Sequence, residues 1–266
     1  MMEKQIIDTS LGEIAVYKKG PVNDRLPIIF LHGVYFDHNM WDEYVQHFTD
    51  RMVITIDMPW HGESRGNISA RWSLDECADM LIAILKKLRI SSVIAIGHSW
   101  GSMTILRAAV KSPELFASAG YCNMPFQAAS RKQKLAFRFQ HLALPFRTFY
   151  TKQAGRSLFG KSSLKENPAL MKELQRSMSI LSSRQIRLTD TFVILQAEDA
   201  SDTLAELKVP AMALKGQEDY VPATPYISNE IIPGGHISPL EQPMATLHFI
   251  RQVIRLAEKS QETTPY

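Results

Sequence analysis

Ser99 stands in a Gly-x-Ser-x-Gly pattern, residues 97–101, that could make a serine hydroxyl chemically reactive. A serine hydroxyl is a weak nucleophile, so it must be exposed and lie beside a base. A sharp turn from a strand into a helix achieves this, and it needs residues without a Cβ on either side of the serine. The apolar run before Gly97 and the helix-forming run after Gly101 fit that context. The alternative is a tight turn that carries an idle serine.

A base and a second carboxylate follow later in the chain, in the order Ser99, Asp219, His236. Both come just after short apolar runs that predict strands, so they should lie at the same edge of a sheet as the serine. His236 would accept the serine proton, and Asp219 would orient the imidazole. Taken alone, each could be an ordinary turn residue, and Glu218 is a rival for the carboxylate. Asn123 holds another position at which an acid could stand, but an amide carries no charge.

Catalysis at a carbonyl also needs two N–H groups that bind the developing oxyanion. One should be the backbone N–H of Trp100, directly after the serine. We expect the other from Val34, in the loop that begins with His32 and Gly33. The alternative is that this loop is only a turn at the end of a strand.

Periodicity predicts the elements that must position these residues. Short apolar runs predict strands, and an apolar stripe beginning after a Ser73–Glu76 capping box predicts a helix. The predicted strands cover residues 4–8, 13–18, 27–31, 52–56, 91–96, 116–122, 209–214 and 230–232, and the predicted helices cover residues 41–48, 74–88, 100–110 and 241–257.

Alternating strands and helices predict an α/β fold with a mostly parallel, doubly wound sheet. The alternation stops after Asn123 and returns near residue 209. We therefore predict a core built from residues 1–124 and 191–266, with residues 125–190 inserted as a helical cap over the catalytic edge. Such an insertion is where substrate specificity would reside.

Composition narrows the class of protein. The 266 residues carry a formal charge of +3, which is too small to suggest binding to nucleic acid. Cys77 and Cys122 offer no disulfide framework and suit a reducing compartment. Because the chain also lacks a signal-peptide pattern and a long apolar run, we expect a cytoplasmic protein. No cofactor and no metal are expected, since the histidines lack the spacing of metal ligands.

The net charge hides an uneven distribution. Residues 125–190 contain thirteen Lys and Arg against three carboxylates, a formal +10, which leaves −7 for the rest of the chain. One interpretation is a solvated helical surface. The other is attraction of an anionic partner, such as an acyl carrier protein, a coenzyme A ester or a membrane surface, of which we expect membrane contact least.

Aromatic residues near the serine indicate an apolar acyl site. We expect Tyr35, Phe36, Trp41 and Cys122 to line the substrate pocket. The side chain of Trp100 could contribute as well, or could only pack the turn. The oligomeric state is not indicated by the sequence.

Four motifs together resemble the α/β-hydrolase superfamily, in the group of pimeloyl-carrier-protein methyl ester esterases and proline iminopeptidases. They are His32-Gly33 and residues 57–64, 97–101 and 235–243. The resemblance implies that the loop at Asp57 supports the sheet and that His98 is structural.

The resemblance and the residues together predict a serine hydrolase. It would cleave a carboxylic ester or thioester of a small molecule, which could be anionic or carrier-linked, through an acyl-enzyme intermediate. The alternatives are hydrolysis of a lactone or small amide, and a ligand-binding or signalling protein on a hydrolase scaffold.

Overall fold

A single sheet of eight strands forms the centre of the molecule. The computed structural model describes residues 2–67 and 71–262. The strands are β1 (Glu3–Thr9), β2 (Gly12–Lys19), β3 (Ile28–Leu31), β4 (Val53–Ile56), β5 (Val93–His98), β6 (Phe116–Cys122), β7 (Ala211–Gly216) and β8 (Ser228–Ile232).

The strand order across the sheet is β1-β2-β4-β3-β5-β6-β7-β8. The pairs β1–β2 and β2–β4 are antiparallel, and every later pair is parallel. This arrangement confirms the predicted α/β-hydrolase fold. Because β3 to β7 all end at one edge, the loops that follow them meet there.

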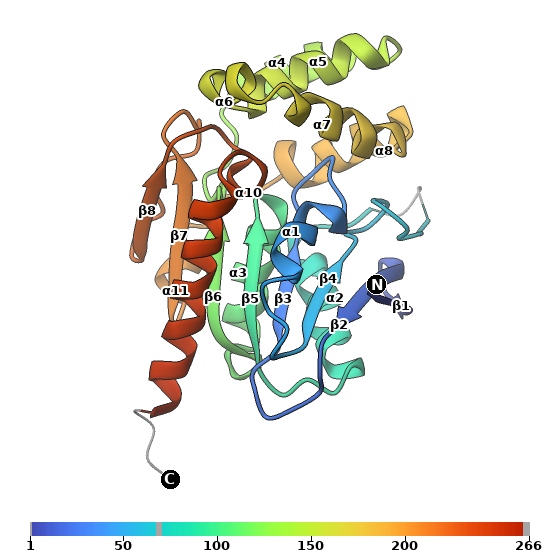
Figure 1. The fold of residues 1–266 in the computed structure, drawn as a ribbon. Coiled ribbons are helices and arrows are strands. Elements are labelled where there is room, and N and C mark those ends of the chain that lie inside the picture. Colours follow the sequence, from blue (N-terminus) through green and yellow to red (C-terminus); the bar gives the residue numbers. More distant parts are fainter. Residues whose placement is uncertain (1, 68–70, 263–266) are drawn as a thin grey trace.

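Helices cover both faces of the sheet and its carboxyl edge. The helices are η1 (His38–Trp41), α1 (Asp42–Val45), α2 (Leu74–Lys87), α3 (Trp100–Lys111), η2 (Pro113–Leu115), α4 (Arg131–His141), α5 (Arg147–Leu158), α6 (Lys161–Glu166), α7 (Ala169–Ser179), α8 (Ser183–Asp190), η3 (Thr191–Leu195), α9 (Ser201–Ala205), α10 (Ser238–Glu241) and α11 (Pro243–Glu262). The helix α11 lies on one face, whereas α2 and α3 lie on the other (Figure 1).

The central strands are mostly apolar, because both of their faces are buried. All the residues of β3, β4 and β5 are buried. The helix α2 begins at the predicted capping box, in which Ser73 and Glu76 each bond to the other's backbone N–H. Its buried stripe then packs toward the sheet.

The helix predicted at residues 41–48 lies earlier in the structure, at residues 38–45, and only its second half is α-helical. The side chain of Asp37 accepts a hydrogen bond from the N–H of Asn39, which starts a 3₁₀ turn, η1, before the α-helical turn α1. A side-chain cap at the entry therefore moves the start of the element upstream.

The segment predicted as an insertion, residues 125–190, forms the helices α4 to α8. These helices lie beyond the carboxyl ends of the strands, at the top of Figure 1. Within the described residues, no helix combines the length and the apolar composition needed to cross a bilayer.

Candidate functional site

Ser99 lies in the sharp turn between β5 and α3, with a backbone φ of 48° and ψ of −108°. A non-glycine residue in this region is strained, and it persists only where its surroundings force it. The turn closes tightly because its flanking glycines have no side chain. A Cβ on Gly97 would lie 2.4 Å from the backbone N of Ser102, and one on Gly101 would lie 2.3 Å from the backbone O of Leu31. The pattern predicted from the sequence therefore has a steric cause.

The three side chains predicted to react together do lie in hydrogen-bond contact. The Oγ of Ser99 is 3.0 Å from Nε2 of His236. The Nδ1 of His236 is 2.9 Å from Oδ1 of Asp219. When the imidazole carries its proton on Nδ1, it donates to Asp219 and accepts from the Ser99 hydroxyl, which is the arrangement that a general base requires.

Asp219 is held as an anion by its neighbours. Its Oδ2 accepts a hydrogen bond of 2.8 Å from Nδ2 of Asn123, and its Oδ1 accepts one of 3.1 Å from the N–H of Val221. Burial acts to raise the pKa of Asp219, but the adjacent His236 and these hydrogen bonds hold the pKa below its usual value. The rival Glu218 lies elsewhere, since its carboxylate accepts from the hydroxyl of Ser162.

His236 is fixed on two sides. Its carbonyl oxygen lies 2.8 Å from Nε2 of His98. Burial lowers the pKa of His98 to about 3, so this ring is neutral and uses Nε2–H to hold the backbone of His236. The ring of Tyr220 stacks on His236 with 4.7 Å between the centroids. Sequence analysis missed Tyr220, although its place directly after Asp219 was a usable signal.

Of the two predicted oxyanion donors, one directly follows the serine in the chain and the other lines the cavity at the serine. Trp100 is the first residue of α3, so its N–H has no acceptor within the helix. Val34 lines the cavity that reaches Ser99. Beside it, Tyr35 has a φ of 73°, and Asn123 has a φ of 51°. Left-handed backbone at non-glycine residues thus gathers around the serine, as it does at functional sites.

A cavity of about 130 Å³ opens at Ser99 and His236. Its apolar lining includes Val34, Tyr35, Met103, Phe137, Leu158 and Val193. The polar side chains of Gln127 and Gln133 also line it. Among the described residues, no Lys, Arg, Asp or Glu lines this cavity. An uncharged group would therefore fit it best.

The structure separates the four predicted pocket residues. Tyr35 lines the cavity, whereas Phe36, Trp41 and Cys122 do not line it and are buried in the core. The ring of Trp41 stacks on Phe30 and is wholly buried. Cys122 ends β6 with its side chain wholly buried, and burial raises the pKa of its thiol. The sequence placed these residues near the loops around Ser99, but it did not indicate which way their side chains point.

The side chain of Trp100 packs the turn. It lies parallel to Trp72 with 5.4 Å between the ring centroids, and it is fully buried.

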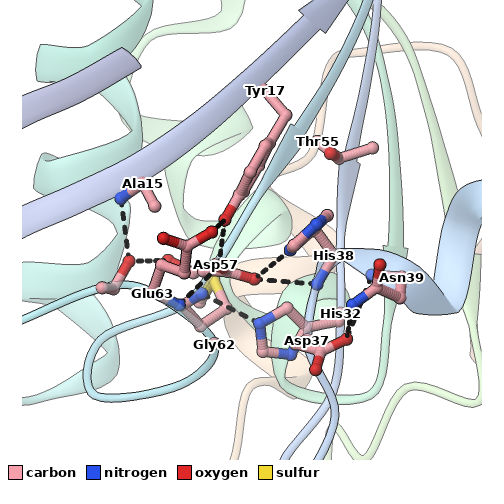
Figure 2. A network of polar contacts seen from close by, with 12 residues as sticks. Ala15, Tyr17, His32, Asp37, His38, Asn39, Thr55, Asp57, Gly62 and Glu63 are labelled. Carbon is pink, nitrogen blue, oxygen red and sulfur yellow. Dashed lines mark hydrogen bonds and ion pairs between the residues drawn. The ribbon is translucent and has the colours of Figure 1, made fainter. Parts of the chain in front are cut away.

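Asp57 organises a second buried network, next to the loop after β4 (Figure 2). Its carboxylate accepts from the hydroxyl of Tyr17 at 2.9 Å and from the N–H of Glu63 at 2.8 Å, and it lies 2.9 Å from Nδ1 of His38. Burial acts to raise the pKa of Asp57, but the hydrogen bond and charge of His38 hold it below its usual value. Nearby, Nε2 of His32 accepts from the N–H of Met58 at 2.9 Å. The network joins loops and supports the sheet edge, as the resemblance implied.

A third network joins the helices of residues 125–190 to the loop beside the serine. The hydroxyl of Tyr35 donates to Oδ1 of Asp190 at 2.7 Å, and Oδ2 of Asp190 binds both Tyr150 at 3.1 Å and His141 at 2.8 Å. Asp190 is fully buried. This network was not predicted, because Tyr35 and Asp190 stand 155 positions apart with no local signal that pairs them.

Across residues 2–67 and 71–262, no three His, Cys, Asp or Glu side chains are grouped so that they could hold a metal ion.

Comparison with known proteins identifies the fold and the family of this chain. The sequence model of the alpha/beta hydrolase fold matches residues 27–221. The chain is 23% identical over 243 residues to 3-oxoadipate enol-lactonase 2 of Acinetobacter baylyi, covering 87% of this chain and 90% of that protein.

Solved structures agree. A thermophilic esterase from Thermogutta terrifontis superposes with a TM-score of 0.82 at 21% identity, covering 96% of this chain and 99% of that one. The enol-lactonase from Burkholderia xenovorans LB400 superposes with a TM-score of 0.79 at 15% identity, covering 91% and 96%. With this sheet and a family match over most of its length, the chain belongs to the alpha/beta hydrolase family.

Proposed function

We propose that this protein is a serine hydrolase that cleaves a small, uncharged carboxylic ester or thioester. One observation carries the proposal: Ser99 sits in a strained turn and its Oγ lies 3.0 Å from Nε2 of a histidine whose Nδ1 lies 2.9 Å from a buried carboxylate. Family membership supports a hydrolytic reaction.

Acylation begins when Ser99 Oγ attacks the carbonyl carbon of the substrate. His236 Nε2 takes the hydroxyl proton, and the imidazolium that forms is stabilised by Asp219. The N–H groups of Trp100 and Val34 donate to the oxyanion of the tetrahedral intermediate. His236 then gives its proton to the leaving oxygen or sulfur, which departs and leaves an acyl group on Ser99.

Deacylation repeats these steps with water. His236 removes a proton from a water molecule, the hydroxide attacks the acyl carbon, and the proton returns to Ser99 as the acid leaves. Held in one cavity, the water and the acyl carbon react without a bimolecular encounter.

The cavity favours a small acyl group. Its volume of about 130 Å³ is well below the roughly 300–1,000 Å³ of pockets for drug-sized ligands. Without a Lys or Arg in the described lining, an anionic acyl group would lose its hydration and gain no counter-charge.

A lactone is a second candidate substrate. The relative named 3-oxoadipate enol-lactonase 2 aligns over 87% of this chain. A lactone is an internal ester, so the same serine, histidine and carboxylate would open it, and the leaving oxygen would stay on the product.

Hydrolysis of p-nitrophenyl acetate and butyrate tests the proposal. We expect a burst of p-nitrophenol followed by steady turnover, and Ser99→Ala should lower kcat by about 10⁴-fold or more. A fluorophosphonate should label Ser99 in the wild type and leave the folded Ser99→Ala variant unlabelled.

Comparing p-nitrophenyl acetate and butyrate with a five-membered enol lactone separates the two substrate classes. A higher kcat/KM for the lactone would assign the lactonase reaction. Wild-type protein that turns over no ester, thioester or lactone, and resists the fluorophosphonate, would overturn the proposal in favour of a binding protein on a hydrolase scaffold.

A further inference from the structure

The helix α4 presents a row of large apolar side chains to solvent. Leu135 is 54% exposed, Phe139 63% and Leu142 72%, and their spacing of four and three residues puts them on one side of the helix. Shortly after the helix, Phe146 is 72% exposed, and Phe149, in the first turn of α5, is 55% exposed. We call these five residues the outer apolar row. Large apolar side chains gathered in this way mark a surface that contacts something else.

Cations accompany the outer apolar row. Residues 125–165 contain nine Lys and Arg and no Asp or Glu. On α4, Arg131, Lys134 and Arg138 follow one another at intervals of three and four residues. Among the described residues, no carboxylate forms an ion pair with these three cations. The surface therefore combines protruding apolar groups with uncompensated positive charge.

The opposite side of α4 faces the cavity. Gln133 and Phe137 line the cavity that reaches Ser99, so this one helix separates the candidate catalytic site from the outer apolar row. In Figure 1, α4 and α5 lie at the end of the molecule farthest from the amino ends of the parallel strands. A flat surface could meet this end of the molecule without contacting the sheet.

We propose that the outer apolar row and its cations dock on an anionic lipid surface. Lipid headgroups supply negative charge, and the boundary between headgroups and acyl chains accepts phenyl and isobutyl groups. An acidic protein partner would satisfy the cations, but charge alone gives no reason for three phenylalanine rings to stand in water. The absence of a long apolar helix excludes spanning among the described residues, and it leaves this peripheral mode open. The expectation from sequence that ranked membrane contact last could not use the exposure of these side chains.

Sedimentation with vesicles tests the docking, using the full chain. We expect binding to phosphatidylcholine–phosphatidylglycerol vesicles, little binding to phosphatidylcholine alone, and loss of binding as salt is added. The variant Arg131→Gln, Lys134→Gln, Arg138→Gln should lose about 10- to 100-fold in vesicle affinity. The variant Phe139→Ser, Phe146→Ser should lose about 10-fold or more.

Matched controls change the same residue types elsewhere. Val22→Ser with Met244→Ser alters exposed apolar side chains far from α4, and Lys86→Gln, Lys208→Gln, Arg255→Gln removes as many exposed cations. These controls should bind vesicles as the wild type does. All the variants should keep the wild-type melting temperature and the wild-type rate on a soluble ester, which separates docking from the hydrolytic proposal.

Three outcomes would overturn the docking proposal. The wild type could fail to bind anionic vesicles, the controls could lose as much affinity as the α4 variants, or the phenylalanine variant could retain full binding. Tight binding to a purified acyl carrier protein without vesicle binding would reassign the surface to an acidic protein.

Discussion

Among the described residues, two of the three aspartate–histidine pairs use the same imidazole nitrogen at the same distance but have different surroundings. Asp219 and His236 approach to 2.9 Å through Nδ1, and so do Asp57 and His38. Each aspartate follows a strand at the carboxyl edge of the sheet, and each has its pKa held below the usual value. In each pair, therefore, an anionic carboxylate is bonded to Nδ1 of an imidazole.

The difference lies at the far side of each imidazole. Nε2 of His236 meets the hydroxyl of Ser99 at the wall of a cavity. The ring of His38 instead stacks on the ring of Tyr17, with 3.7 Å between the ring centroids. The hydroxyl of Tyr17 in turn donates to Asp57 (Figure 2). A hydrogen-bonded aspartate and histidine can thus serve only to hold loops together. Such a pair can serve catalysis only where a turn presents a nucleophile and a cavity admits a substrate.

Asp219→Asn should have the largest effect on this comparison. An amide at this position favours the wrong imidazole tautomer, so kcat should fall by about 10⁴-fold with the fold intact. Ester hydrolysis with a thermal melt measures both. Glu218→Gln is the matched control, because its carboxylate bonds to Ser162 and not to His236. Equal losses in the two variants would contradict the assignment of Asp219.

Asp57→Asn should act on stability instead. Removing one charge from a buried ion pair costs about 3–5 kcal/mol, so the free energy of unfolding should fall by that amount. Denaturant unfolding measures it. At a temperature where the variant is folded, kcat should stay within a few-fold of the wild type. A loss of kcat as large as that of Asp219→Asn would erase the distinction between the two pairs.

Asn123→Ala should have a smaller effect on catalysis. It removes the donor to Oδ2 of Asp219, and hydrogen bonds to charged groups contribute about 1.5–3 kcal/mol, so kcat should fall by roughly 10- to 100-fold. Without this donor the pKa of Asp219 rises, so its carboxylate holds the imidazole of His236 less firmly. Asn123→Ser can still donate and should recover part of the rate. An unchanged kcat in Asn123→Ala would argue against this role.

His38→Gln should give the smallest effect, visible as a pH dependence of stability. Burial acts to lower the pKa of His38, but the hydrogen bond and charge of Asp57 raise it above the usual value. Protonated His38 therefore contributes stability that is fully present below the unfolded pKa of about 6.5 and is lost as the pH rises through the folded pKa.

The difference in unfolding free energy between wild type and His38→Gln should thus shrink as the pH rises above about 6.5 and through the raised folded pKa. His47→Gln, at an exposed histidine, should show no such trend. A difference that stays constant with pH would mean that His38 is neutral in the folded protein.

Local patterns in the sequence predicted the parts that have local causes. The turn at Ser99 needs two glycines at fixed offsets, and α2 needs Ser73 and Glu76 at its start, so both can be read from a few adjacent residues. The strand-then-polar-residue pattern also brought Asp219 and His236 together, because parallel strands share a carboxyl edge.

Side-chain direction and distant contacts could not be predicted in the same way. Phe36 follows the cavity-lining Tyr35 by one position yet points into the core, because the positive φ of Tyr35 turns the chain. Asp190, the last residue of α8, accepts a hydrogen bond from Tyr35, which stands 155 positions earlier. The residues next to each of them in the sequence give no sign of this contact. Side-chain direction follows a regular period in strands and helices, but in loops it depends on the dihedral angles of each residue.

The strained backbone of Ser99, at φ 48°, has a consequence for directed evolution. A glycine there would relax the turn, so Ser99→Gly should withstand heat better than its parent while doing no chemistry. Selection for thermal stability alone would therefore favour variants that lack the Ser99 hydroxyl. Any directed improvement of this enzyme must therefore score survival and turnover together.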